Sequence, residues 1–388
     1  MPDTAPLTRP IAAGIVTALV GFTSSFAVVL TGLAAVGATP DQAASGLLAL
    51  SLTMGTVCIV LAMRHRMPIT VAWSTPGAAL LAATTAGSWP AAVGAFLIVA
   101  TLILLTALVP RIGALIAAIP PSIAQAMLAG VLLPLCIAPV SGLVENPWGV
   151  VPVVATWLLF SRVAPRWAVP AAFVAAAVVV VVGLAESGTP LDPALLLPRF
   201  ELTAPVLTVE AAIGLALPLF IVTMASQNVP GVAVMRSFGY EVPWRSSMLV
   251  TGVGSALSAP AGGHAINLAA ISAALAAAPD ADPDPSRRWV AGVSTGVTYL
   301  VLGGGSAVFA ALALLAPTAV IPAVAGLALL GAFGLAVQQA IDDPGERVPA
   351  VVTFLVAASG VAPLGISAAF WALIAGLLVR GVLHLGRR

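Results

Sequence analysis

One short segment, PAGGHAIN from Pro260 to Asn267, places a histidine and an amide inside an otherwise apolar part of the chain. A proline and two glycines stand just before His264, and residues of these types interrupt a helix. At membrane depth an interrupted backbone is tolerated only where protein buries it or where it lines a cavity, and ionisable residues there are functional candidates. Because histidine titrates near neutral pH, His264 is a candidate for contacting a substrate or carrying a proton. The alternative is a neutral histidine that holds a backbone carbonyl.

A second interrupted segment, PITVAWSTPG from Pro68 to Gly77, is likewise short, apolar and marked by proline and glycine. If each segment begins a half-helix near the middle of the bilayer, the unpaired N–H groups of the two helix ends face each other. Each helix N-terminus carries roughly half a positive charge, so the pair suits an anion without lysine or arginine. For Asn267 a purely structural role is an equal alternative. The candidate substrate-binding residues on the two segments are Trp73 (a flat apolar wall), Ser74, Thr75, Gly77, Gly263, His264, Ala265 and Asn267.

Two further apolar segments carry clusters of small polar side chains. The sequence TMASQN supplies Gln227 and Asn228, which must find hydrogen-bond partners on a polar ligand or on a neighbouring helix. The sequence FTSSF supplies Phe22 and Ser24, although such hydroxyls also bond the carbonyl four residues earlier. No acidic residue lies within the core of a predicted span, which disfavours coupling to sodium. We expect no metal site and no cofactor.

The composition excludes an ordinary soluble domain. Of the 388 residues, 60% are hydrophobic and 7% are charged, lysine is absent from the sequence, and the mean hydropathy is +1.12. A chain of this length has room for on the order of fourteen spans of about 20 residues each. Cys58 and Cys136 lie in apolar runs without disulfide or metal spacing. The charged run Asp280–Arg288 fits no nucleotide or metal site and is expected to be a solvated connection, and we expect no nucleic-acid partner.

The apolar runs predict an all-α integral membrane protein of about 14 transmembrane segments. The first repeat (residues 1–185) holds spans at 11–37, 43–63, 70–85, 91–109, 121–142, 148–163 and 167–185. An extracytoplasmic linker (186–207) precedes the second repeat (208–388), with spans at 209–230, 246–258, 263–278, 289–315, 318–338, 348–360 and 364–385. With both termini in the cytoplasm, fourteen of the fifteen arginines fall on the cytoplasmic side and only Arg199 falls outside, as the positive-inside rule requires.

The two halves also resemble each other in sequence. The run PSIAQAMLAG from Pro121 matches PTAVIPAVAG from Pro317, and Pro68 before the third span corresponds to Pro260 before the tenth. An odd number of spans in each half makes the repeats inverted in the membrane, a 7+7 arrangement typical of secondary transporters. In such transporters, corresponding broken segments form the binding site, which points again to spans three and ten.

These motifs resemble those of the benzoate:proton symporter family of bacterial inner membranes, which is similar in fold to the uracil-permease and sulfate-transporter group. The resemblance is carried by ITVAWSTPG (69–77), TMASQNVPG (223–231) and GGHAINLAA (262–270), and it extends along essentially the whole chain. It implies a core domain of spans 1–4 and 8–11, a gate domain of spans 5–7 and 12–14, and substrate between the half-helices of spans three and ten. Nucleobase carriers of the wider group have acidic residues on spans eight and ten, near the positions of Gln227 and His264. This difference favours a ligand that brings its own carboxylate.

We therefore expect a multi-pass transporter of the bacterial inner membrane that takes up benzoate, or a close aromatic carboxylate, together with a proton. The carboxylate would face the two half-helix ends, Gln227 would donate a hydrogen bond, and the ring would pack on Phe22 or Trp73. His264 is the candidate for proton coupling; alternatively, benzoic acid carries the proton itself. A carrier of another small organic anion and an uncoupled channel on the same fold are alternatives, and a homodimer in the lipid bilayer is left open. An enzyme is not expected, because His264 has no partner acid, metal cluster or activated nucleophile in the sequence.

Overall fold

The computed structural model describes residues 7–84, 88–109, 111, 119–188, 193–270 and 272–385. Part of the predicted linker (189–192) and two of the predicted cytoplasmic arginines, Arg387 and Arg388, lie outside the described residues. The described chain is mostly helical. A helix satisfies its backbone groups within the segment, which is the arrangement that a bilayer demands of long apolar runs.

The helices follow the predicted spans along the chain. The first half contains α1 (Thr8–Thr23), α2 (Phe26–Ala35), α3 (Pro40–His65), α4 (Thr75–Ala82), α5 (Trp89–Leu108), α7 (Pro121–Glu145), α8 (Pro147–Val163) and α9 (Ala168–Ser187). The second half contains α10 (Val209–Ala211), α11 (Leu217–Thr223), α12 (Val229–Ser237), α13 (Trp244–Ser258), α14 (Ala273–Ala277), α15 (Trp289–Gly304), α16 (Ser306–Leu315), α17 (Val320–Ile341), α18 (Arg347–Ala358) and α19 (Ala368–His384). Two π-helical turns, Ala212–Ala216 and Met224–Asn228, join α10, α11 and α12 into one long helix, and the two strands are β1 (Val71–Trp73) and β2 (Ile266–Leu268).

The all-α membrane class predicted from composition is confirmed. Among the described residues, seven helical segments are long and apolar enough to cross a membrane, and α15 with α16, bent by 52° at their junction, adds an eighth. Three further apolar helices, α8, α18 and α19, are shorter. The remaining predicted spans are the short helix α13 and the two broken segments that contain β1 and β2.

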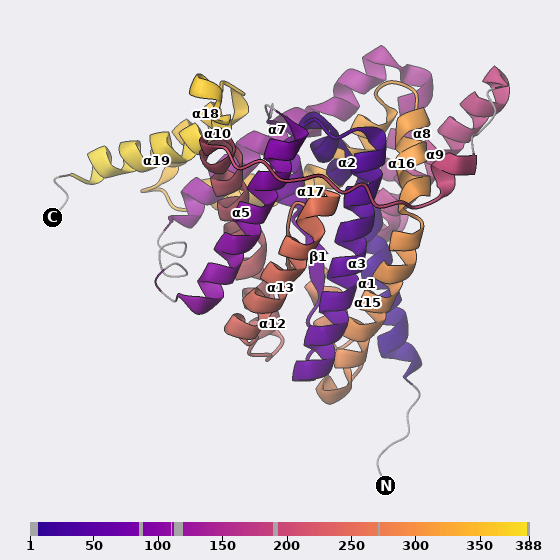
Figure 1. Ribbon diagram of the computed structural model, residues 1–388, viewed down its shortest axis with the longest axis horizontal. Helices are drawn as coiled ribbons and strands as arrows, with labels where there is room; N and C mark the ends of the chain where they lie inside the picture. Colours follow the sequence, from indigo (N-terminus) through magenta and orange to yellow (C-terminus); the bar gives the residue numbers. More distant parts are fainter. Residues whose placement is uncertain are drawn as a thin grey trace, which may run out of the picture.

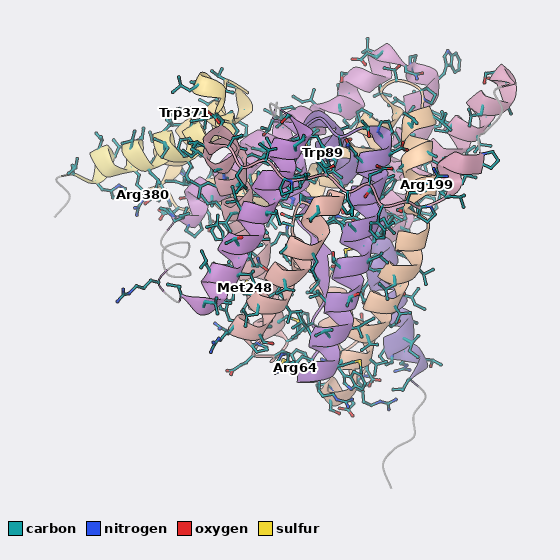
Figure 2. The ribbon with its side chains drawn as sticks, in the orientation of Figure 1. Arg64, Trp89, Arg199, Met248, Trp371 and Arg380 are labelled. Carbon is teal, nitrogen blue, oxygen red and sulfur yellow. The ribbon has the colours of Figure 1, made fainter. Side chains whose placement is uncertain are left out.

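The long helices pack in two groups. Figure 1 shows α3, α5, α13 and α15 running side by side, while α19 extends away from them. In the first group, α15 packs against α1 and α3, and α13 packs against α3 and α5. In the second group, α7 packs against α17 and α18, and α18 packs against α19. Arg64 and Arg199 lie at opposite ends of the bundle, as the predicted layout requires (Figure 2).

Small residues bring the helices of the first group close together. Gly55 of α3 and Gly296 of α15 face each other, and a Cβ built on either would meet the carbonyl oxygen of the other at 2.7 or 2.5 Å. Such close backbone approach is typical of helix pairs in membranes, where dispersion contacts rather than the hydrophobic effect drive association. The tight contact between α3 and α15 supports β1, which packs against α3.

The two broken segments meet as a two-stranded antiparallel sheet inside the bundle. β1 pairs with β2, with Trp73 opposite Ile266. The half-helix predicted to begin in the segment Pro260–Asn267 does not begin there: Gly263–Ala265 lead into β2, and the helix that follows, α14, begins only at Ala273. Strand pairing satisfies the backbone groups that a helix would otherwise satisfy, so the chain stays extended here.

The linker between the halves crosses one end of the bundle in extended form (Figure 1). The Glu201 N–H donates to Ser45 Oγ at 2.9 Å, and the Thr203 N–H donates to the carbonyl oxygen of Pro260 at 2.8 Å. Trp89 Nε1–H in turn donates to Thr203 Oγ1 at 2.8 Å. These contacts tie the linker to the broken segment that carries the central histidine.

The charged loop between α14 and α15 is packed more tightly than the solvated connection predicted from its composition. Arg288 and Asp282 are each only 5% exposed. Arg288 Nε donates to the carbonyl oxygen of Asp282 at 2.7 Å, and its Nη1 donates to that of Ala277 at 2.9 Å. A guanidinium that bonds the last carbonyls of a helix acts as a C-terminal cap, so Arg288 fixes the end of α14.

Candidate functional site

Helix α4 begins directly after β1, and Ser74 is the residue at the junction. Its hydroxyl accepts a hydrogen bond from the Gly77 N–H at 3.1 Å and bonds Thr223 Oγ1 of α11 at 2.7 Å. All three residues are buried. Serine is a favoured helix N-cap because its oxygen satisfies an N–H that has no partner within the helix. Ser74 therefore fixes the start of α4 and joins span three to span eight.

Most N–H groups in the first turn of α4 are already committed. Pro76 has no N–H, the Gly77 N–H bonds the Ser74 side chain, and the Ala78 N–H donates to the Ser74 carbonyl at 2.7 Å. Within the described part of the chain, the Thr75 N–H is the one donor of this turn without a partner. The predicted set of free N–H groups thus reduces to one backbone donor, beside the half-buried Thr75 hydroxyl.

His264 is fully buried and bonds the start of α4. Its Nε2–H donates to the carbonyl oxygen of Ser74 at 3.0 Å, and because a carbonyl only accepts, this bond places a proton on Nε2. The Ser74 N–H donates to the Ala265 carbonyl at 3.1 Å, so two bonds join the segments here. His264 Nδ1 has no hydrogen-bond partner among the residues that the structure describes. The ring lies edge-on to Phe96 of α5, with centroids 6.3 Å apart.

The turn that delivers His264 requires a glycine. Gly262 has a φ of +96°, a left-handed conformation that residues with a Cβ rarely adopt. A side chain there would also meet the backbone of Gly46 on α3 and the ring of Trp89, each at 3.1 Å. The adjacent Gly263 N–H donates to the Ser258 carbonyl at 2.9 Å. Gly262 and Gly263 therefore form the turn that leads into β2, and no helix starts at them.

Two asparagines hold β2 in place. Asn228 is fully buried, its Oδ1 accepts from the Leu268 N–H at 2.9 Å, and its Nδ2 contacts Met224 Sδ at 3.2 Å. Asn267 Nδ2 donates to the Leu268 carbonyl at 2.8 Å, while Asn267 Oδ1 is buried without a partner in the described chain. The side chain of Asn228 is thus occupied by the strand, whereas Asn267 Oδ1 is an acceptor without a partner among the described residues.

Gln227 lies in the π-helical turn Met224–Asn228 of span eight. It is half-buried, and no hydrogen bond to its side chain is found in the described ranges. Thr223, which bonds Ser74, is four residues earlier, so Gln227 lies on the same side of the helix, one turn away. π-helical turns are frequent at functional sites. The Gln227 amide is therefore a polar group on the helix side that faces the start of α4.

Aromatic rings gather beside β1. Phe22 of α1 lies 5.1 Å from Trp73 and 4.9 Å from Phe309 of α16, measured between ring centroids. Phe26 of α2 lies 4.5 Å from Phe173 of α9 and 5.1 Å from Phe309. Tilted and edge-on pairs at such separations attract one another. The five rings, which we call the aromatic cluster, bring residues from four helices and one strand to one apolar wall.

The break in span one positions Trp73. α1 ends at Thr23 and α2 begins at Phe26, and between them Ser25 Oγ accepts a hydrogen bond from Trp73 Nε1–H at 2.8 Å. Ser24 Oγ donates to the Gly21 carbonyl, three residues earlier, at 3.1 Å, so it bonds its own helix, although not the predicted carbonyl four residues earlier. Of Ser24 and Ser25, the residue that contacts the candidate site is thus Ser25, which lies in the FTSSF motif but was not among the predicted binding residues.

Several residues that the structure brings to the site were not predicted from the sequence. A signal was available for Phe309, because Gly303, Gly304 and Gly305 precede it and mark the bend between α15 and α16. Thr223 lay within the motif that supplied Gln227, but its spacing gave no reason to prefer it. No feature of the sequence pointed to the contact of Phe173 with Phe26.

Comparison with known proteins relates the whole chain to one family. The family model described as BenE, benzoate membrane transport protein, matches residues 5–382. The inner membrane protein YdcO of Escherichia coli is 38% identical over 381 residues, which cover 96% of this chain and 95% of that protein. The benzoate membrane transport protein of Acinetobacter baylyi is 30% identical over 379 residues, which cover 96% of this chain and 94% of that protein.

The fold is similar to that of a solved anion carrier. The transmembrane domain of a cyanobacterium bicarbonate transporter, BicA, matches with a TM-score of 0.57, covering 98% of this chain and 97% of that chain. The two sequences are 15% identical, so the similarity establishes the fold alone. It agrees with the predicted relation to the sulfate-transporter group.

Proposed function

Because the chain belongs to the BenE family of benzoate membrane transport proteins, we propose that it takes up benzoate, or a close aromatic carboxylate, together with a proton across the bacterial inner membrane. It is a multi-pass membrane protein, and its family and fold are those of transporters and not of enzymes. The aromatic cluster and the start of α4 support benzoate as the cargo, and the buried His264 supports coupling to a proton.

The observation that carries the proposal is the position of the aromatic cluster next to the start of α4. Trp73 belongs to the cluster, and the next residue, Ser74, caps the helix. Benzoate has a flat apolar ring joined directly to a carboxylate, so adjacent residues can recognise both parts. The ring would pack on Phe22 and Trp73, and the carboxylate would accept hydrogen bonds from the Thr75 N–H and the Gln227 amide.

The electrostatics of the site suit a weakly held monovalent anion. Within the described chain, the residues around α4 include no acidic or basic side chain besides His264, so the positive end of α4 and neutral donors would stabilise the carboxylate. A nucleobase would instead present ring N–H donors, which call for an acidic acceptor. On spans eight and ten, where nucleobase carriers have acidic residues, this chain instead has the amide of Gln227 and the ring of His264.

We further propose that transport moves a core against a gate. The core comprises spans 1–4 and 8–11 (α1–α5 and α10–α16), and the gate comprises spans 5–7 and 12–14 (α7–α9 and α17–α19). Helix packing supports this division, because α15 and α13 pack among core helices while α7 packs against α17 and α18. Phe173 belongs to the gate and Phe26 to the core, so their contact crosses the boundary between the two parts. A substrate ring bound there would change how closely core and gate pack against each other.

We assign the co-transported proton to His264 Nδ1. This atom is a buried acceptor without a partner in the described structure, and buried polar atoms of this kind call for an explanation. A carboxylate bound beside it would favour the protonated ring. In the alternative, benzoic acid carries its own proton, and His264 serves only to hold the Ser74 carbonyl.

Uptake by purified protein in liposomes tests the cargo. Labelled benzoate should accumulate when the lumen is made alkaline, and unlabelled salicylate should compete better than urate or uracil. Phe22→Ala should raise the KM for benzoate several-fold, because it removes one face of the ring site. Phe160→Ala, which alters a half-buried ring of α8 outside the aromatic cluster, is the control for loss of a phenyl ring elsewhere in the protein. Equal competition by uracil, or equal effects of both variants, would contradict the proposed cargo.

Two substitutions of the histidine test the proton assignment. His264→Gln keeps a side-chain N–H for the Ser74 carbonyl but has no titratable nitrogen, so it should bind benzoate and lose accumulation driven by the pH gradient. His264→Ala should lose both accumulation and stability, because the hydrogen bond to Ser74 is gone. Proton-driven accumulation that persists in His264→Gln assigns the proton to benzoic acid. Unitary currents in planar bilayers would indicate an uncoupled channel instead.

A further inference from the structure

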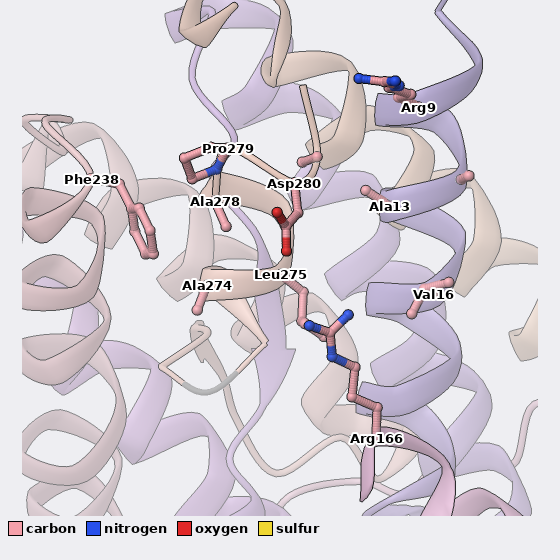
Figure 3. A pocket seen from close by; sticks show the side chains of 12 residues that line it. Arg9, Ala13, Val16, Arg166, Phe238, Ala274, Leu275, Ala278, Pro279 and Asp280 are labelled. Atoms are coloured by element: carbon pink, nitrogen blue, oxygen red, sulfur yellow. The ribbon is translucent and has the colours of Figure 1, made fainter. Parts of the chain in front are cut away.

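A cavity opens beside the first half of α1. Its volume is about 700 Å³, and it lies between α1, α14 and the connection that holds Arg166 (Figure 3). Ala13, Val16 and Leu275 give it an apolar wall, and Phe238 lies across from α1. Arg166 reaches in beside Val16, and no ion pair or hydrogen bond of its guanidinium is found among the described residues.

We propose that this cavity is a second binding site for the transported aromatic carboxylate, with Arg166 as its anion-binding residue. The inference rests on the proposed function, because that function supplies the class of ligand. The site would receive the anion after it leaves the aromatic cluster, before release at the end of the bundle where α1 begins.

The chemistry of the cavity fits an aromatic carboxylate. Ligand pockets of about 300–1,000 Å³ bind small molecules through apolar walls and a few placed polar groups, and this cavity has that size and character. A guanidinium binds a carboxylate through two parallel N–H···O bonds, and Arg166 has no competing partner in the described chain. Asp280 also lines the cavity, and its negative charge opposes the ligand, which keeps binding weak enough for release.

The cavity lies near the aromatic cluster along α1. Val16 and Phe22 lie six residues apart on α1, which is about 9 Å along the helix axis. Leu275 belongs to α14, the helix that follows β2 along the chain. Helix α1 and the segment that begins with β2 thus contribute residues to both sites. Arg9, in the first turn of α1, lies at the opposite end of the cavity from Arg166 and adds a second positive charge there.

Cysteine labelling of the cavity wall tests this proposal without measuring transport. Cys58 and Cys136 are buried, so Ala13→Cys places one accessible thiol in the cavity of the full-length protein. The two arginines should make this thiol react about fivefold or more faster with a sulfonate-bearing methanethiosulfonate reagent than with a trimethylammonium one, after correction for free cysteine. Benzoate should slow the reaction, and benzyl alcohol, which has the ring without the carboxylate, should not.

Arginine variants identify the anion-binding residue. In the Ala13→Cys background, Arg166→Gln should abolish most of the protection by benzoate, whereas Arg162→Gln, an exposed arginine near the end of α8 outside the cavity, should preserve it. Protection should also persist in Phe22→Ala, which weakens the first site alone. Equal effects of the two arginine variants, protection by benzyl alcohol, or loss of protection in Phe22→Ala would overturn the inference.

The uptake assay distinguishes failure of the second-site proposal from failure of the proposed function. Normal benzoate uptake without protection of the cavity thiol would refute the second site and leave the cargo intact. Protection by benzoate in a protein that takes up no benzoate would refute the proposed cargo and leave an anion-binding cavity.

Discussion

Replacement of Ser74 by alanine removes one oxygen that takes part in two buried hydrogen bonds. The lost N-cap bond to the Gly77 N–H is worth about 1 kcal/mol in helices of known proteins. The lost bond to Thr223 Oγ1 joins two spans, and such bonds between membrane helices are worth about 0.6 kcal/mol on average. We therefore expect Ser74→Ala to lower the free energy of unfolding by about 1.5–2 kcal/mol.

Unfolding in mixed detergent micelles measures this loss, and the chain supplies a matched control. Ser88 occupies the N-cap position of α5 but is exposed and makes no side-chain cap bond. Ser88→Ala should therefore change the free energy of unfolding by less than about 0.5 kcal/mol. A double-mutant cycle of Ser74→Ala with Thr223→Val isolates the bond between the spans, for which we expect a coupling of about 0.6 kcal/mol.

The same variant should affect transport, because Ser74 holds the Thr75 N–H next to the aromatic cluster. An increase in the KM for benzoate is expected in Ser74→Ala and not in Ser88→Ala. A Ser74→Ala protein as stable as Ser88→Ala, or a coupling with Thr223 of zero, would refute the reasoning that this hydroxyl fixes the start of α4.

Three further substitutions test the surroundings of the site. Gly262→Ala should destabilise the protein by about 1–2 kcal/mol or more, because the φ of Gly262 is +96° and neighbouring atoms fill the space that a Cβ would need. Gly334→Ala, in an open position of α17, should be neutral or stabilising in the same unfolding assay. Trp73→Phe should keep the ring contacts but lose the bond to Ser25, which would raise the KM for benzoate and loosen the break in span one, as measured by hydrogen exchange of its amides. Arg288→Gln should release the loop after α14 and speed its cleavage in limited proteolysis, because three charged hydrogen bonds to carbonyls are lost. Cleavage at the rate of the unchanged protein would contradict this role.

The class of protein and the segments of the candidate site could be predicted from the amino-acid sequence alone. Long apolar runs can exist in a bilayer only as helices or closed barrels, so these runs predicted a helical membrane protein with many spans. Proline and glycine marked the two segments in which the helix is broken, and those segments hold β1, β2 and the buried histidine. The family motifs named Trp73, Ser74 and His264, and the structure brings these three residues together.

The hydrogen-bond partners of the broken backbone could not be predicted from the sequence, because they come from distant segments of the chain. The segment before Asn267 is as compatible with a helix start as with a strand, because glycine and proline signal an interruption without specifying whether a helix or a strand comes next. β1 supplies the partner, and it lies in the other half of the chain, as does the Ser74 carbonyl that His264 bonds. The same holds for the contact between the rings of Phe173 and Phe309, which lie on different helices. It also holds for the burial of Arg288, which depends on its bond to the Ala277 carbonyl. Local sequence carries no record of such pairings, since they arise from how the helices pack against one another.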